Sequence, residues 1–280
     1  MVATLNIIGC GNVGKVLGRL WAQSGVFLIQ DVLNRSLGSA TAAVDFIGMG
    51  RPVGDWAELR PADALLIGTP DDRIEAACDS LIRSGTLRPA ATVFHCSGAL
   101  PSHILAKTRS YGASVASVHP IRSFAGPESV AASFPGTWCG IEGDLPAVES
   151  LSAAFSAIGA QLVRINPEYK SVYHAAAVFS SNYLVALLDV AVEAYAKAGV
   201  PREEALKLME PLVRGTVDNV FRLGTTDALT GPIARGDVAT VLRQYRAVSS
   251  WDKRAGALYK RLGKFAAGIA ARRRKHSKSD

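Results

Sequence analysis

The sequence contains only four cysteines, and no two of them are separated by just two residues: Cys10, Cys78, Cys96 and Cys139. Disulfide frameworks and structural zinc sites need closely paired cysteines. We therefore expect reduced thiols, as in a cytoplasmic protein, and no metal site. The N-terminus also lacks a basic segment before its first apolar run, so we expect no signal peptide.

Charged residues make up only 20% of the 280 residues, against 49% hydrophobic residues. This balance excludes an intrinsically disordered protein, which would be poor in apolar residues and rich in charge. The 26 glycines and 13 prolines are ordinary numbers and exclude a collagen-like chain. At about 100–200 residues per domain, the length predicts two domains.

Positive charge is concentrated at the C-terminus. The formal net charge is +7, and residues 270–280 contain five Lys or Arg and one Asp. Such a tail could contact nucleic acid or anionic lipid, but a solvated and frayed C-terminus explains it more simply. We therefore expect no specific nucleic-acid partner.

Residues 171–188 form a run of 18 residues without formal charge. It contains His174, Ser180, Ser181 and Asn182, which are costly inside a bilayer. The run therefore favours a buried core helix over a membrane span, and we expect no membrane partner.

The first 166 residues alternate between strand-like and helix-like patterns. Short apolar runs predict strands over 4–9, 27–33, 64–67, 92–95, 114–118 and 137–141. Between the first two runs, five apolar residues share one face of a helix: Val13, Val16, Leu17, Leu20 and Trp21. This alternation predicts a parallel sheet covered by helices on both faces.

The residues after 166 show helical patterns only. Asn166-Pro167-Glu168 predicts an N-cap followed by Pro at the first helical position. The helix should run to residue 198, because Gly199 and Pro201 then supply stop signals. Further helices are expected over roughly 202–222, 237–249 and 251–273.

A glycine motif follows the first predicted strand. Gly9-Cys10-Gly11-Asn12-Val13-Gly14 has the pattern G-x-G-x-x-G and opens a helix. Gly9 permits a tight turn, Gly11 lets a pyrophosphate approach the main chain, and Gly14 lets helix and strand pack closely. The predicted fold class is therefore α/β, with an N-terminal Rossmann-type doubly wound sheet over 1–166 and an all-α C-terminal domain over 167–280.

The end of the second predicted strand distinguishes NADP from NAD. NAD-binding proteins place an acidic residue there for the ribose hydroxyls, but Asn34 occupies this position. Arg35 and Ser36 follow it and could bind a 2′-phosphate. NADP is therefore favoured over NAD, and Asp31, inside the strand, is the alternative ribose ligand.

Two further turns follow predicted strands, Gly68-Thr69-Pro70 and Cys96-Ser97-Gly98. Ligands of open α/β sheets bind at the carboxyl ends of the strands, so both turns could contact a cofactor or substrate. Ordinary turn chemistry explains them equally well.

Histidines are scarce, and two of the five are candidates for catalysis. Reduction of a carbonyl needs a hydrogen-bond donor and a proton at its oxygen. His119 follows the strand 114–118, and His174 shares a helix stripe with Ser181 and Asn182, with Lys170 one turn earlier. A core histidine with internal hydrogen bonds is the alternative for both.

Two arginines could hold a substrate carboxylate. Arg122 lies three residues after His119, and Arg235 lies in the Gly- and Pro-containing segment 230–237. An N-cap at Asp237 with an exposed Arg235 is the alternative for that segment.

Five segments together resemble a known group of proteins: IIGCGNVG, FHCSGAL, VHPIRSF, YHAAAVFSSNYLVALL and TGPIARGD. The chain is similar to bacterial Rossmann-like proteins with a helical C-terminal domain of uncharacterised function. These belong to the superfamily of 6-phosphogluconate dehydrogenase, ketopantoate reductase and prephenate dehydrogenase. The resemblance spans nearly the whole chain, and the last two segments are the most specific to the group.

The resemblance carries over to single residues only in part. Prephenate dehydrogenases have a catalytic His in a strand–His-Pro motif, which matches His119, and a serine that matches Ser97. Ketopantoate reductases use a Lys with an Asn eight residues later. Here His174 precedes Asn182 by eight residues, and Lys170 lies one turn further out. The proton donor thus stays open among His119, His174 and Lys170.

The resemblance implies an NADP-dependent oxidoreductase that transfers hydride to a small 2-keto acid, with ketopantoate as the leading substrate. A prephenate- or imine-type enzyme and a non-catalytic NADP-binding protein are the alternatives. Relatives also suggest a homodimer formed by the C-terminal helices. The expected catalytic residues are His119, His174, Asn182 and Ser97, and the expected substrate-binding residues are Lys170, Ser181, Arg122 and Arg235.

Overall fold

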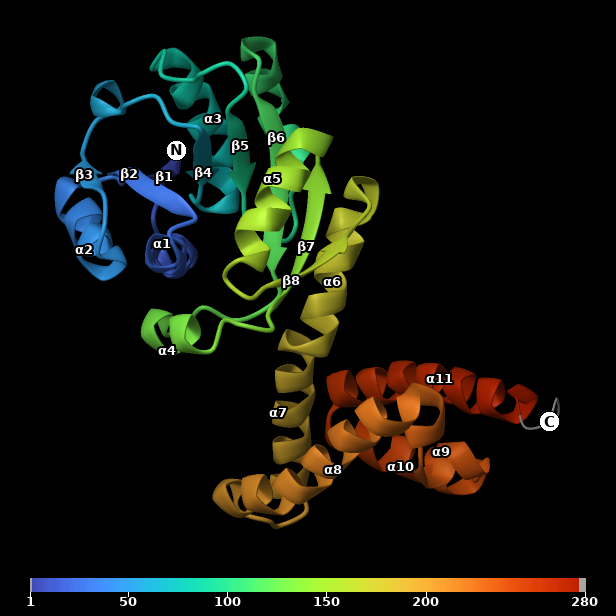
Figure 1. Cartoon of the computed structure of the whole chain (residues 1–280). Helices are drawn as coiled ribbons and strands as arrows, with labels where there is room; N and C mark the ends of the chain where they lie inside the picture. Colours follow the sequence, from blue (N-terminus) through green and yellow to red (C-terminus); the bar gives the residue numbers. More distant parts are fainter. Residues whose placement is uncertain (1, 277–280) are drawn as a thin grey trace. The chain divides into compact units, whose positions relative to one another are not determined.

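The computed structural model describes residues 2–276, which form two compact units that divide between Phe179 and Ser180. The first unit contains a sheet with its helices, and the second contains helices (Figure 1). The division lies later than residue 166, because the first helix after the last strand groups with the sheet. Residues 277–280 of the basic tail lie outside the described residues, and the tail before them is helical rather than frayed.

The first unit is built on an eight-stranded sheet in the order β3-β2-β1-β4-β5-β6-β7-β8. Neighbouring strands are parallel except β6 and β7, which are antiparallel, so the predicted all-parallel sheet is wrong at this edge. The strands are β1 (Ala3–Ile8), β2 (Phe27–Leu33), β3 (Arg51–Val53), β4 (Ala64–Ile67), β5 (Thr92–His95), β6 (Ser114–Pro120), β7 (Trp138–Gly143) and β8 (Gln161–Arg164).

Six strands lie where apolar runs predict them. The edge strands β3 and β8 are not predicted, because they have only three and four residues and most of β8 is exposed. Such short strands produce no apolar run or alternation that periodicity can detect.

Helices cover both faces of the sheet (Figure 1). On one face, Trp21 packs edge-to-face against Phe27, Phe94 and Phe155, and its indole N–H donates to the carbonyl of Ala154 over 3.0 Å. The helices of this unit are α1 (Asn12–Ser24), α2 (Leu37–Ile47), α3 (Ile74–Arg83), α4 (Pro127–Ala132), α5 (Leu145–Ser156) and α6 (Lys170–Ser180), with the 3₁₀ helices η1 (Trp56–Glu58), η2 (Asp71–Arg73), η3 (Ser102–Tyr111) and η4 (Pro167–Tyr169).

The second unit has a small hydrophobic core. Its described core cluster contains three buried side chains, Val192, Ala205 and Met209, while Leu212 and Phe221 are 62% and 86% exposed. Its helices are α7 (Asn182–Lys197), α8 (Arg202–Ala228), α9 (Gly231–Arg235), α10 (Val238–Trp251) and α11 (Lys253–His276).

The helix expected to run to residue 198 is divided. Ser181 has φ −122° and ψ −73°, and it separates α6 from α7. By length and composition, Pro167–Lys197 could cross a membrane. Only 6% of its apolar window is buried within the chain, and this low burial bears on the prediction of a core helix. The predicted buried core helix is therefore wrong for the single chain, whose exposed apolar faces need another cover.

Candidate active site

The glycine motif forms a tight loop between β1 and α1. Gly9 has φ +80°, and a Cβ there would lie 2.6 Å from the Thr69 side chain. Around Gly11, by contrast, no described atom lies within 4 Å of a Cβ position. Gly11 is also the N-cap of α1 and offers no side-chain cap, so the first N–H groups of the helix are available to an anion.

Asn34 shapes this loop from the end of β2. Its side-chain oxygen accepts a hydrogen bond from the Cys10 N–H over 2.6 Å, and its amide donates to the carbonyl of Ser39 over 2.9 Å. The predicted cofactor ligand is thus a brace for the glycine loop, with both ends of its amide engaged.

Asp31 is not available to a ribose. Its carboxylate is fully buried and pairs with Arg51 over 2.9 Å and with Arg60 over 2.7 Å. Burial opposes its ionisation, but hydrogen bonds from Arg60 and Arg51 outweigh this and lower the pKa of Asp31. The alternative ribose ligand is therefore excluded by its own ion pairs.

A cavity of about 1040 Å³ lies beside the glycine loop. Arg35 and Arg73 line it, and the hydroxyl of Thr69, also in its wall, is buried without a hydrogen-bond partner among the described residues. An elongated anion with polar groups fits this lining. The predicted residues that line the cavity are Gly9, Cys10, Gly11, Asn12, Val13, Asn34, Arg35, Gly68, Thr69 and Pro70.

Two predicted cofactor residues do not line the cavity. Gly14 is buried, and a Cβ there would lie 3.2 Å from the Cys10 sulfur, which agrees with its predicted packing role. Ser36 is the N-cap of α2 and accepts a hydrogen bond from the Ser39 N–H. Both residues shape the site without facing it.

Two histidines meet beside Gly98, in the turn after β5. His119 is the last residue but one of β6, His174 lies on α6, and their ring centroids are 5.7 Å apart. A Cβ on Gly98 would lie 2.5 Å from His174 Nδ1 and 2.8 Å from His119 Nε2. The two ring nitrogens therefore converge on one point. His174 Nδ1 is buried and has no hydrogen-bond partner among the described residues.

Burial keeps His119 neutral at pH 7. Burial, together with the nearby His174 and Lys170, lowers the pKa of His119 to about 4, while Asp71 opposes the shift. His119 thus offers an imidazole rather than an imidazolium to a ligand. A neutral ring can donate from one nitrogen and accept at the other.

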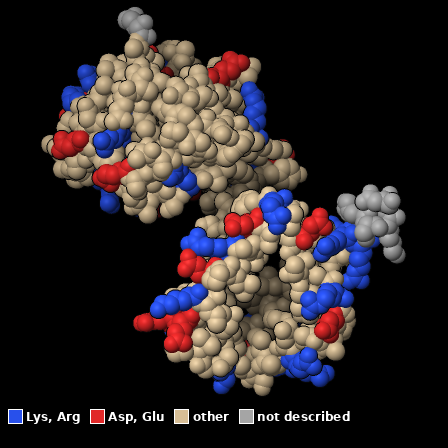
Figure 2. Space-filling view, turned by 60° about the horizontal axis from the view of Figure 1, so that its bottom comes forward, with Lys and Arg blue, Asp and Glu red and all other residues tan. Residues whose placement is uncertain are grey.

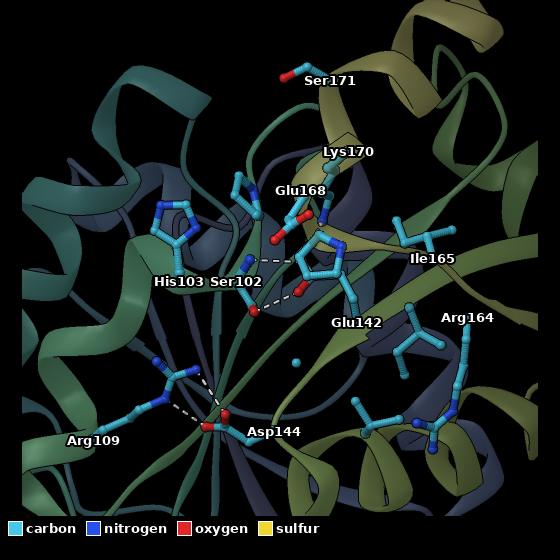
Figure 3. Close-up of a pocket in the computed structure, with 15 residues that line it drawn as sticks. Ser102, His103, Arg109, Glu142, Asp144, Arg164, Ile165, Glu168, Lys170 and Ser171 are labelled. Carbon is cyan, nitrogen blue, oxygen red and sulfur yellow. Dashed lines mark hydrogen bonds and ion pairs between the residues drawn. The ribbon is translucent and has the colours of Figure 1, made fainter.

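A buried ion pair anchors α6 to the sheet. Lys170 is fully buried, and its ammonium donates to Glu142 of β7 over 3.1 Å and to the hydroxyl of Ser117 on β6. The Glu142 carboxylate also accepts hydrogen bonds from the N–H and hydroxyl of Ser102, both over 2.7 Å (Figure 3). His174 follows Lys170 by four residues, so this pair sets the position of His174 over the strand ends.

In this structure the Lys170 ammonium is engaged by Glu142 and Ser117, and its role toward a substrate stays a prediction. Burial lowers the pKa of its ammonium, and Glu142 partly offsets that shift. The charge is satisfied inside the protein, because a buried ammonium is stable only when it is paired and hydrogen-bonded.

Ser97 and Arg122 are likewise engaged within the protein. The Ser97 hydroxyl donates to Asp71 over 2.8 Å and accepts from the Leu100 N–H over 3.0 Å. The Arg122 guanidinium donates to the carbonyl and hydroxyl of Ser133. Both side chains thus help to hold their loops, and their catalytic and carboxylate-binding roles stay predictions.

The remaining predicted residues lie in the second unit. Ser181 forms the break between α6 and α7, Asn182 begins α7, and Arg235 is exposed at the end of α9. Asp237 accepts a hydrogen bond from the Thr240 N–H as the N-cap of α10, as the alternative interpretation predicts. Because Ser181 breaks the helix, the stripe that joins His174 to Asn182 in the sequence is interrupted.

Sequence reasoning misses Tyr173, Glu142 and Gly140. The hydroxyl of Tyr173 lies 3.1 Å from His119 Nδ1. Tyr173 is not on the stripe that marks His174, and Glu142 and Gly140 lie on a strand with no polar motif, so no pattern in the sequence distinguishes them. A buried Lys with a buried Glu could be sought as a pair, but only the fold shows which Glu is the partner.

We predict that Lys170→Met destabilises the protein by about 3–5 kcal/mol, because it leaves the Glu142 carboxylate buried without its counter-ion. Urea unfolding followed by circular dichroism measures this. The double variant Lys170→Met/Glu142→Gln should recover much of the loss. Lys107→Met removes an exposed lysine that also pairs with acidic residues and serves as the control. Equal effects of Lys170→Met and Lys107→Met would contradict the anchoring role.

Residues 137–265 match a family described as a domain of unknown function, DUF2520. A comparison with curated proteins gives no significant match.

Solved structures share the fold over nearly the whole chain. Protein TM1727 from Thermotoga maritima is 27% identical, with a TM-score of 0.79, over 96% of this chain and 99% of the other. A protein named as an NADP oxidoreductase, BF3122 from Bacteroides fragilis, is 22% identical with a TM-score of 0.74, over 95% and 98%. An imine reductase from Myxococcus stipitatus, in complex with NADP⁺, is 15% identical with a TM-score of 0.63, over 98% and 94%. The chain therefore has a Rossmann-like sheet and a helical C-terminal region, matches the DUF2520 model over residues 137–265, and shares its fold with proteins named as NAD(P)-dependent oxidoreductases.

Proposed function

We propose that this protein is an NADP-dependent oxidoreductase that reduces a polar double bond in a small substrate. One observation carries the proposal: the glycine-loop cavity and the paired histidines lie at the carboxyl ends of the adjacent strands β1, β4, β5 and β6. Ligands of open α/β sheets bind at this edge. The neighbours named as NADP oxidoreductase and imine reductase, the latter with NADP⁺ bound, agree with it.

The cavity residues fit NADP. The free N–H groups at the start of α1 would hold the pyrophosphate, and Arg35 at the end of β2 would hold the 2′-phosphate. Asp31 does not compete there, because it is enclosed by Arg51 and Arg60, and Asp72, which also lines the cavity, pairs with Arg73. NADP, when bound, supplies the hydride.

The histidines supply the polar part of the reaction. His119 Nε2 and His174 Nδ1 both lie against Gly98, in the turn after β5, and a substrate whose double bond reaches this turn would hydrogen-bond to them through its oxygen or nitrogen. Fixed donors at this atom stabilise the charge that develops as hydride arrives. An imidazole N–H can then pass its proton to the same atom.

A 2-keto acid of the ketopantoate type is the first substrate candidate, and a cyclic imine is the second. Within the described part of the sheet unit, Lys170 and Arg122 are committed to protein partners. In the helical unit, Arg235 is exposed and is the remaining predicted carboxylate ligand. The imine alternative is supported by the imine reductase from Myxococcus stipitatus, which shares the fold, as does a pyrroline-5-carboxylate reductase from Coxiella burnetii.

We predict substrate-dependent oxidation of NADPH by the full chain when 2-keto acids and cyclic imines are tested in parallel. His119→Asn should lower kcat/KM by about 100-fold or more, because a positioned donor is lost at the reacting atom. His103→Asn, on η3, is the matched control and should leave the rate unchanged. A folded protein that binds NADPH but oxidises none with any substrate of the panel would overturn the enzymatic proposal.

We also predict that Arg35→Ser weakens NADPH binding by about tenfold or more while NADH binding changes little, because only NADPH has the phosphate that Arg35 would pair with. Isothermal titration with both nucleotides measures the difference. Arg88→Ser is the control. Arg88 lies just before β5, at the amino ends of the strands, where it pairs with Asp63. Equal losses for NADPH and NADH in Arg35→Ser would contradict the assignment.

We propose that a second copy of the chain covers the helical unit. Figure 2 shows a hollowed, uncharged face on this unit, bordered by charged residues. A helical unit with so few buried side chains has too little core for stability alone. A bilayer is a poorer cover, because α7 carries Asp189 and Glu193, both paired with Arg202 of α8.

The predicted species is therefore a homodimer of twice 29.5 kDa in analytical ultracentrifugation at micromolar concentration. Phe221→Glu should dissociate the dimer. Phe221 is 86% exposed in the single chain, so its apolar ring contributes little to the stability of the monomer and is available to an interface. Leu37→Glu, an exposed position of α2, is the control. A stable monomer would reject the proposal, and so would a requirement for detergent or vesicles.

A further inference from the structure

Tyr173 contacts His119 on the side of the ring that faces away from Gly98. Its hydroxyl lies 3.1 Å from His119 Nδ1, and the two rings meet edge-to-face with centroids 5.7 Å apart. The other ring nitrogen, Nε2, lies toward Gly98 and His174. His119 is thus hydrogen-bonded to Tyr173 at one nitrogen, and its other nitrogen lies against Gly98 beside His174.

Space for the tyrosine comes from Gly140 of β7. Gly140 is directly opposite His119 in the antiparallel register of β6 and β7. A Cβ on Gly140 would lie 2.5 Å from the Tyr173 hydroxyl oxygen and 2.8 Å from its ring carbon Cζ. The hydroxyl therefore occupies the place that a side chain on the partner strand would fill, and it reaches Nδ1 only because that side chain is absent.

The direction of this hydrogen bond follows from the chemistry of the two groups. Burial raises the pKa of Tyr173 to about 12 and lowers that of His119 to about 4, so both are neutral at pH 7. A neutral phenol is a strong donor and a weak acceptor, whereas an unprotonated imidazole nitrogen is a strong acceptor. The tyrosine O–H therefore donates to Nδ1, and the single ring proton of His119 lies on Nε2.

We propose that Tyr173 is a positioning residue that holds His119 in the Nε2–H tautomer, so that the nitrogen of His119 beside Gly98 and His174 is the one that carries the proton. His174 Nδ1, which has no partner among the described residues, lies against the same glycine. The substrate contact rests on the proposed function, but the tautomer is a property of the protein without cofactor or substrate.

This arrangement would determine what the site accepts. A fixed N–H donor binds a carbonyl oxygen or an imine nitrogen through its lone pair, and it disfavours groups that can only donate. In other enzyme sites, too, a hydrogen bond to one ring nitrogen of a histidine fixes the tautomer that its other nitrogen presents to the substrate. The charged groups near His119 are Lys170 of α6, which pairs with Glu142, and Asp71 of η2. A substitution of Tyr173 leaves these charged groups in the protein.

The test is ¹⁵N NMR of the full chain labelled at its histidines, without cofactor. The His119 signals are those that disappear in His119→Asn. We expect a protonated Nε2 and an unprotonated, hydrogen-bonded Nδ1. In Tyr173→Phe, the Nδ1 signal should shift toward that of a nitrogen without a donor. Tyr169→Phe, an exposed tyrosine in the preceding turn, should leave the signal unchanged.

Gly140→Ala is the second variant, because it keeps the tyrosine but displaces its hydroxyl. It should change the Nδ1 signal as Tyr173→Phe does, and circular dichroism shows whether each variant is folded. A wild-type proton on Nδ1, or an Nδ1 signal unchanged in folded Tyr173→Phe, would overturn the inference.

The kinetic arm separates this inference from the proposed function. If NADPH oxidation occurs, Tyr173→Phe should lower kcat about tenfold with little change in KM, because loss of one hydrogen bond is worth about that factor. Expected NMR shifts with no activity in any variant would reject the proposed function and leave the tautomer assignment intact.

Discussion

The buried pair of Lys170 and Glu142 holds the two parts of the candidate site together. Without it, α6 has no charged anchor on β6 and β7, and Tyr173 and His174, one turn further along, lose their fixed height above His119. A buried ion pair adds little net stability compared with apolar packing, but it has strict geometry. Its contribution here is to allow one placement of the helix, which a catalytic arrangement requires.

Absent side chains shape the site as much as present ones. Gly9 lets the nucleotide loop approach the Thr69 turn, Gly98 leaves room for two imidazoles, and Gly140 leaves room for the tyrosine hydroxyl. Each glycine stands where a neighbouring strand or helix comes too close for a Cβ. Burial keeps His119 and Tyr173 neutral, so the contact between them depends on the direction of a hydrogen bond rather than on charge.

How well the sequence predicts a site residue depends on how far apart in the chain the interacting residues lie. Asn34 and Arg35 are found from their spacing after the glycine motif, because both belong to one local βαβ pattern. Asn34 nevertheless bonds to Cys10 rather than facing outward, and Lys170 and Ser97 satisfy partners inside the protein. A sequence shows which polar residues are present, but their partners are decided by strands that meet from distant positions.

The sequence by itself determined the α/β class, six of the eight strands and the glycine loop, because these depend on local periodicity and short-range turn chemistry. Only the tertiary structure decided that β7 runs antiparallel, that Ser181 breaks the long helix, and that Gly140 admits Tyr173 to His119. Those features arise from contacts between segments far apart in the chain, which leave no period or spacing in the sequence.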